Sequence, residues 1–206
     1  MIQAASDSGT ALPTYQSPFR AIDTGTRIVN NESMKPDAVA RSQDDLAQAI
    51  LELQRLNPLL ALQATLEELD RARLALPHLA EGPEWATSNV VRDRLAGINT
   101  TEDCKAYSEA LILKIINSEQ TSYSDLEQAQ REYTFCCYRL ALAAVDPEEG
   151  RLDFAALEIA EAYGYHPTRD GRSAYSELTS RFQERIDALG HRQAEGPRLR
   201  NSLLSF

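Results

Sequence analysis

Residues 124–147 read SDLEQAQREYTFCCYRLALAAVDP, and this stretch decides the fold class. Ser124 followed three residues later by Glu127 is a capping box, which predicts a helix start. Asp146-Pro147 predicts its end, because proline cannot continue a helix. One stripe at three- and four-residue steps is expected to face inward: Leu126, Ala129, Tyr133, Cys136, Leu140 and Ala144. The stretch therefore predicts one long amphipathic helix.

The same helical spacing appears upstream, on both sides of Asn57-Pro58. Asn is a good N-cap and Pro suits the first helical position, so this dipeptide is expected to end one helix and begin another. The expected inward residues are Val39, Leu46, Ile50, Leu53 and Leu56 before it, and Leu59, Leu62, Leu66, Leu69 and Leu76 after it. We expect the two helices to form an antiparallel hairpin.

Four further helices are predicted from their start and stop signals. A short one follows Gly82-Pro83 and is closed by Gly97, and the next is capped by Thr100 or Thr101. Their inward residues are expected to be Trp85, Val90, Val91 and Leu95, then Cys104, Tyr107, Leu111, Ile115 and Ile116.

The last two helices are predicted near the C-terminus. One is expected to be capped by Asp153 and to end near Tyr163, with Gly164 in a left-handed conformation. The other runs from about Gly171 to Leu189, with Gly190 after it. Its inward residues are expected to be Tyr175, Leu178, Phe182, Ile186 and Leu189.

These patterns predict an all-α fold: a single bundle of six or seven helices over residues 36–189. Residues 1–35 are rich in Ser and Thr and lack periodicity, so they are expected to form an extended or flexible N-terminal arm. Residues 190–206 form a short basic and apolar C-terminal tail. A small-sheet protein is the alternative fold, but only five Val occur and alternating runs are absent.

The chain has 206 residues and a formal net charge of -10. This acidity argues against general affinity for nucleic acid or anionic membranes, which needs clustered Lys and Arg. No run of apolar residues is long enough to predict membrane insertion. The N-terminus lacks the pattern of a secretory signal, so synthesis in a reducing cytoplasm is expected, with the final location left open.

Sequence motifs for chemistry are missing, so we expect no enzyme activity, cofactor or metal site. His78, His166 and His191 have no helical partner at metal-ligand spacing. Cys136-Cys137 is interpreted as part of the core. Four carboxylate pairs are interpreted as solvated or helix-capping: Asp44-Asp45, Glu67-Glu68, Glu102-Asp103 and Glu148-Glu149.

Residues 157–182 bear some likeness to a helix-turn-helix, with Arg172, Ser173, Tyr175 and Arg181 on the candidate recognition helix. The connection between the helices is longer than usual and the region is acidic. A helical corner within the bundle is therefore the favoured interpretation.

The terminal segments are the expected partner-binding regions. In the arm, Tyr15, Phe19 and Ile22 are aromatic or apolar anchors in a polar stretch. The tail can form an apolar ridge flanked by cations if it becomes helical. The tail residues concerned are Arg192, Arg198, Leu199, Arg200, Leu203, Leu204 and Phe206.

Three functions remain open from the sequence. The first is a non-enzymatic assembly protein, such as a virion component, whose acidic body docks to neighbouring subunits through its terminal segments. The second is a bacterial effector or type III secretion-system component with an N-terminal export segment. The third is an acidic inhibitor or regulator of a basic partner, because the body carries 27 acidic and 15 basic side chains.

Overall fold

The computed structural model describes residues 36–76, 79, 82–119, 122–164 and 171–203, with side chains for 38–76, 79, 82–119, 122–164 and 173–190. In this part of the chain the fold is all-α, with seven helices of nine residues or more and no strand. They are α1 Pro36–Leu56, α2 Pro58–Ala75, α3 Thr87–Leu95, α4 Thr101–Asn117, α5 Asp125–Ala143, α7 Leu152–Gly164 and α8 Gly171–Leu203. Two single turns complete the order: the 3-10 helix η3 Pro83–Ala86 and the short α6 Pro147–Gly150.

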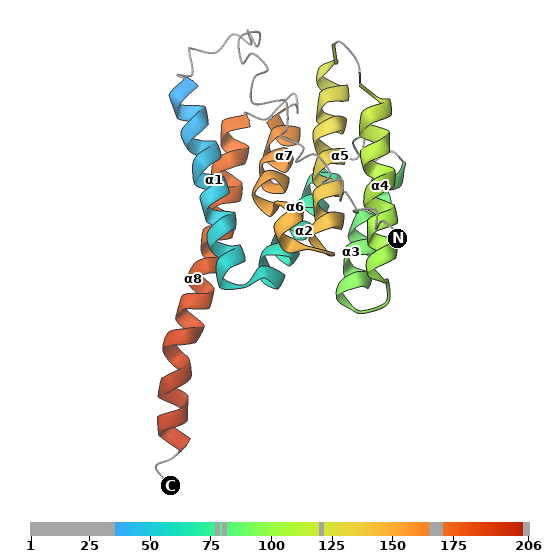
Figure 1. Ribbon diagram of the computed structural model, residues 1–206. Helices are drawn as coiled ribbons and strands as arrows, with labels where there is room; N and C mark the ends of the chain where they lie inside the picture. Colours follow the sequence, from blue (N-terminus) through green and yellow to red (C-terminus); the bar gives the residue numbers. More distant parts are fainter. Residues whose placement is uncertain (1–35, 77–78, 80–81, 120–121, 165–170, 204–206) are drawn as a thin grey trace, which may run out of the picture. The chain divides into compact units, whose positions relative to one another are not determined.

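Helix α5 packs against α4 on one side and against α7 on the other (Figure 1). Helix α1 packs against both α7 and α8, and α2 contacts α1, α7 and α5. The described helices belong to one compact unit, Lys35–Phe206. The predicted all-α bundle is confirmed, and it brings α5, α7, α8 and α1 together around a common core.

The predicted helix starts are confirmed where side chains cap them. The Asn57 side chain accepts a hydrogen bond from the Leu60 amide at 3.0 Å. Thr100 and Ser124 each form a reciprocal capping box, with Asp103 and Glu127 respectively. These contacts satisfy amides that a helix leaves without intrahelical partners, so local sequence fixes where these helices begin.

Three predicted helix ends differ in the structure. Asp153 lies inside α7 rather than capping it, and its carboxylate pairs with Arg151. Arg151, just before α7, has the left-handed conformation with φ of 50°, and Gly164 is the last helical residue of α7. Helix α8 continues past Gly190 to Leu203, because glycine weakens a helix by only about 1 kcal/mol unless it turns left-handed.

The predicted inward faces are correct at their centres and wrong near helix ends. Leu46, Leu69, Leu111 and Leu140 are fully buried, but five residues expected to face inward are exposed. These are Leu56, Leu59, Trp85, Ile116 and Leu126, each 40–54 % exposed. Four of them lie in the first or last turn of α1, α2, α4 or α5, and Trp85 lies in η3. The apolar spacing in the sequence therefore continues to the ends of these helices, where no described neighbouring helix covers the side chains.

Candidate functional site

Several carboxylates are buried and hold helices together. Glu84 of η3 is 2 % exposed, and its Oε1 accepts hydrogen bonds from Lys114 Nζ of α4 at 2.5 Å and Thr134 Oγ1 of α5 at 2.7 Å. This contact ties the 3-10 turn to the α4–α5 pair. The Glu84 carboxylate therefore has a structural role, because its Oε1 accepts hydrogen bonds from two neighbouring helices.

Glu68 corrects one prediction, since it was interpreted as part of a solvated pair. Its side chain is fully buried, and its two oxygens contact Arg71 of α2 and Arg181 of α8, the latter at 2.6 Å. The physical reason is that α8 brings a cation over this position, so the charge can be buried with a partner.

The same observation bears on the helix-turn-helix interpretation. Arg181 is engaged by Glu68, and Tyr175 is only 5 % exposed. Helices α7 and α8 pack against each other, as the favoured helical corner requires. Residues 165–170, which would form the turn, and the side chain of Arg172 lie outside the described residues.

A group of three glutamates gathers where α5 meets α7, and we call Glu132, Glu158 and Glu161 the carboxyl cluster. Glu132 of α5 and Glu161 of α7 lie close enough to influence each other's pKa. Burial, reinforced by the neighbouring carboxylates, raises the pKa of Glu132 well above its ordinary value, and burial also raises the pKa of Glu161.

The third member, Glu158, is 8 % exposed and pairs with Arg139 of α5. Arg139 Nε donates to Glu158 Oε1 at 2.6 Å, and the Arg139 guanidinium lies over the Phe154 ring. Glu158 Oε2 is buried and has no hydrogen-bond partner among the described residues. Burial raises the pKa of Glu158 to about 8, although Arg139 opposes the shift.

The three cysteines are buried and unpaired with each other, which confirms the interpretation of Cys136 and Cys137 as core residues. Burial raises the pKa of Cys104, Cys136 and Cys137. The thiols are therefore held in their protonated form, which is a poor nucleophile.

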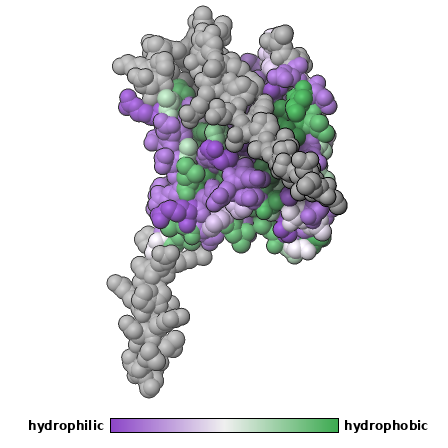
Figure 2. Space-filling model, viewed as in Figure 1, coloured by the Kyte–Doolittle hydropathy of each residue, from purple (hydrophilic) through white to green (hydrophobic). Residues whose placement is uncertain are grey.

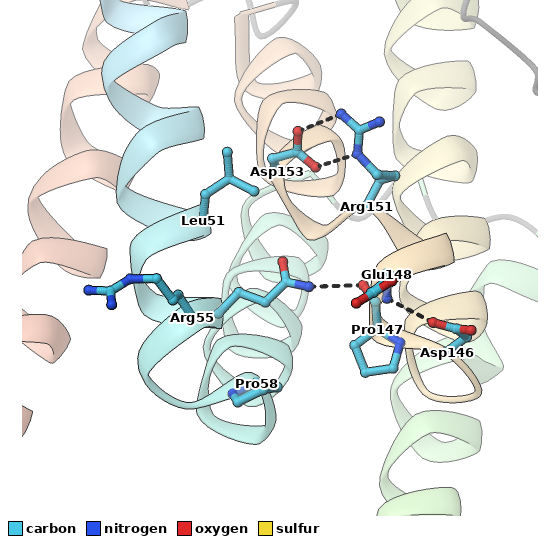
Figure 3. Close-up of a pocket in the computed structure, with 9 residues that line it drawn as sticks. Leu51, Arg55, Pro58, Asp146, Pro147, Glu148, Arg151 and Asp153 are labelled. Atoms are coloured by element: carbon cyan, nitrogen blue, oxygen red, sulfur yellow. Dashed lines mark hydrogen bonds and ion pairs between the residues drawn. The ribbon is translucent and has the colours of Figure 1, made fainter.

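A surface groove of about 740 Å³ lies between the α1–α2 corner and the segment joining α5 to α7 (Figure 3). Gln54 Nε2 donates across it to the Pro147 carbonyl at 3.0 Å. Arg151 forms a two-point ion pair with Asp153, with N–O distances of 3.1 and 2.9 Å. Asp146 caps α6. Most of the polar groups that line the groove are already engaged with one another, and these contacts stabilise the walls of the groove.

A second surface feature is apolar. Leu113 and Ile116 of α4 are 56 % and 53 % exposed, and Leu126 of α5 is 47 % exposed. The loop between α4 and α5 places these three residues at the same end of the pair, and we call them the apolar face. Figure 2 shows a hydrophobic area over this pair of helices. No described element of the chain covers it.

The residues predicted to bind partners are not tested by this geometry. Tyr15, Phe19 and Ile22 lie outside the described residues. For Arg192, Arg198, Leu199, Arg200 and Leu203 only the helical backbone is described, and Leu204 and Phe206 lie outside the description. The sequence analysis missed the apolar face and the carboxyl cluster. The three-residue spacing of Glu158 and Glu161 was visible in the sequence.

The chain matches no protein-family model, curated protein or solved structure in comparison with known proteins. Among the described helices, none has both the length and the apolar character needed to cross a membrane. Within the same residues, no three His, Cys, Asp or Glu side chains are grouped so as to hold a metal ion.

Proposed function

We propose that this chain is a non-enzymatic assembly protein that associates with copies of itself. The observation that carries the proposal is the apolar face, where three large apolar side chains on two adjoining helices are about half exposed. Exposed apolar residues gathered in one place mark an interaction surface, whereas singly scattered ones are ordinary. Burying them against a second protein would remove apolar area from water.

The occupant that we propose for the apolar face is the C-terminal tail, residues 190–206, of a second copy. The tail carries four large apolar residues, which complement the face: Leu199, Leu203, Leu204 and Phe206. Since α8 runs as one helix to Leu203, residues 190–203 do not turn back toward α4 of their own copy. A neighbouring copy provides the α4–α5 pair instead.

Charge complementarity supports this occupant. The surface of α4 and the start of the following loop expose four acidic side chains against two basic ones: Glu102, Asp103, Glu109 and Glu119 against Lys105 and Lys114. The tail carries three Arg and one Glu. Opposite net charges steer two surfaces together and disfavour self-pairing of two acidic α4 helices.

The test is the molar mass of the full chain in solution, measured by sedimentation over a range of concentrations. We expect association that is lost when Leu113→Glu and Ile116→Glu are introduced together, because charges would then be buried in the contact. Leu74→Glu is the matched control, since Leu74 is 78 % exposed on α2, away from the apolar face. Its mass should equal that of the unmodified chain.

A chain truncated after residue 189 keeps the apolar face but lacks the tail that we propose as its occupant. We expect this shortened chain to be monomeric and to bind a peptide of residues 190–206 through the apolar face. Association that persists without the tail would overturn the tail as occupant. A full chain that is monomeric at every concentration would overturn self-assembly altogether.

A further inference from the structure

Helix α4 exposes one line of residues whose chemistry changes along the helix. They follow one another at steps of four and three residues, which places them on the same side of a helix. We call this line the α4 stripe, and all of its members are exposed: Glu102, Ala106, Glu109, Leu113 and Ile116. Its first half is acidic, and its second half belongs to the apolar face. The α4 stripe therefore has a direction, from acidic to apolar.

The C-terminal tail repeats these steps with complementary chemistry. Five tail residues occur at the steps of the α4 stripe, in the same order: Arg192, Gly196, Leu199, Leu203 and Phe206. The first four of them lie in the helical part of the tail, and Phe206 enters through its sequence spacing alone. Both series correspond to about 21 Å of helix. Because Arg198 and Arg200 flank Leu199, the tail changes from basic to apolar along the chain.

Only a parallel alignment matches both halves of the α4 stripe. In that alignment the tail arginines lie beside the acidic half, and the apolar end of the tail lies beside the apolar face. An antiparallel tail that covered the apolar face would carry its arginines past Asn117, where α4 ends. Burial of apolar side chains contributes more than an exposed ion pair, so the apolar match fixes the position of the tail and the charges favour one direction.

The acidic half of the α4 stripe is available to the arginines. Within the described part of the chain, no ion pair or side-chain hydrogen bond engages Glu102 or Glu109. At the other end of α4, Glu127 Oε2 is occupied, because it accepts hydrogen bonds from the amide and the hydroxyl of Ser124. Glu119 is the exposed carboxylate there that an antiparallel tail would use. The two glutamates of the stripe therefore favour the parallel tail.

We propose that two copies of the chain exchange their tails, each tail lying parallel to α4 of the other copy, and so form a closed dimer. The proposal rests on the proposed assembly function and adds the orientation of the tail, its register and the number of copies. Within one copy, α4 and α8 run in opposite directions (Figure 1). A tail that lies parallel to a neighbour's α4 therefore requires the neighbour to point in the opposite direction.

This reversal relates the two copies by a half-turn. Any rotation that reverses the direction of a helix is a half-turn about an axis across that helix, and the same half-turn applied again restores the first copy. When the copies are not displaced along this axis, the tail of the second copy returns to α4 of the first. Such an interface uses the same surfaces on both copies, and it leaves no apolar face open to a third.

The number of copies is tested by the molar mass of the full chain, measured by sedimentation over a range of concentrations. We expect the mass to level off at twice that of one chain. A mass that keeps rising with concentration would show open chains of copies and would overturn the closed dimer, while the contact between tail and apolar face would stand. A monomer at every concentration would overturn the proposed function itself.

The direction of the tail is tested in the full chain by pairs of introduced cysteines, because the three native cysteines are buried. Ala106→Cys together with Gly196→Cys places two thiols at the same level of a parallel pair, so oxidation with diamide should join the copies covalently. Glu102→Cys together with Phe206→Cys is the matched control, since parallel docking keeps these positions about 21 Å apart. Joining of the control pair alone, or of neither pair in a chain that still dimerises, would overturn the parallel register.

The role of the acidic half is tested by charge reversal. Glu109→Arg should weaken the dimer, because it places a third cation beside Arg198 and Arg200. The contact occurs twice in a closed dimer, so a loss of about threefold per contact raises the dissociation constant about tenfold. Adding Arg200→Glu to the same chain should restore most of this loss. Asp44→Arg, exposed on the first half of α1, makes the same change of net charge as the matched control. Equal weakening by Glu109→Arg and Asp44→Arg would overturn the pairing of Glu109 with the tail.

Discussion

Helix α5 takes part in two regions that invert the usual distribution of side chains. Where it meets α7, Glu158 is buried at 8 % exposure, and the side chain of Arg139 that pairs with it is 12 % exposed. Where its first turn adjoins α4, Leu126 is 47 % exposed, at the same end of the helix pair as the exposed Ile116 and Leu113. The difference teaches that coverage by neighbouring helices decides burial here. Polar groups are buried where another helix supplies a hydrogen-bond partner, and apolar groups stay exposed where no described helix reaches.

The largest expected difference in stability comes from making the same Leu→Ala substitution at a buried and at an exposed position of α4. Leu111 is fully buried and Leu113 is 56 % exposed. We expect Leu111→Ala to lower the free energy of unfolding by about 3 kcal/mol, because it leaves a cavity. Leu113→Ala should change the stability of the monomer by less than about 0.5 kcal/mol. Urea unfolding of the two variants measures both, and similar losses would mean that the apolar face is covered within one chain.

The packing of α5 against α6 can be disrupted by a substitution at Gly150 of α6. An added Cβ there would collide with the backbone of Ala143, the last residue of α5. We expect Gly150→Ala to lower the free energy of unfolding by about 2 kcal/mol through overpacking. Gly190→Ala is the matched control in α8, since nothing lies within 4 Å of its added Cβ. This control should be neutral or stabilise by up to about 1 kcal/mol, and equal losses at both positions would contradict the close approach.

A smaller effect is expected from Arg139→Met, which removes the cation beside Glu158 but keeps much of the side-chain volume. Arg139 lowers the pKa of Glu158, so its loss should raise that pKa above about 8. Each unit of the rise corresponds to about 1.4 kcal/mol, and we expect about that loss of stability, largest at pH values where Glu158 is otherwise ionised. Urea unfolding at acidic and alkaline pH checks it.

The control for this charge is Arg55→Met, because Arg55 is exposed at the edge of the groove. Its stability should stay within about 0.5 kcal/mol of the unmodified chain at every pH. A loss for Arg139→Met that does not grow with pH would show that its stacking on Phe154, rather than its charge, stabilises the α5–α7 junction.

Local sequence predicted three helix starts correctly, because their signals act over three or four residues, but the start predicted at Asp153 was wrong, since that residue lies inside α7. Asn57, Thr100 and Ser124 cap the helices that follow them. The ends were less predictable. Gly190 was expected to stop α8, but an achiral residue permits a left-handed turn without requiring one, and the helix continues.

The candidate sites were the least predictable part of the molecule. Glu68 resembles any exposed member of an acidic pair until α8 brings Arg181 over it from 113 positions along the chain. Glu132 and Glu161 likewise come from different helices, and neither residue alone indicates that the other lies near it. Such contacts depend on how α5, α7 and α8 are oriented, which no local spacing specifies.

The sequence by itself determined that this chain is a bundle of α-helices, because capping side chains and apolar periodicity act within one or two turns. It also determined which side of each helix is apolar. Only the tertiary structure decided how far along each helix that side is covered, leaving Ile116 and Leu126 exposed while burying Glu68 and Glu158. The physical reason is that solvation of a side chain depends on the neighbouring helices, and those neighbours come from distant parts of the chain.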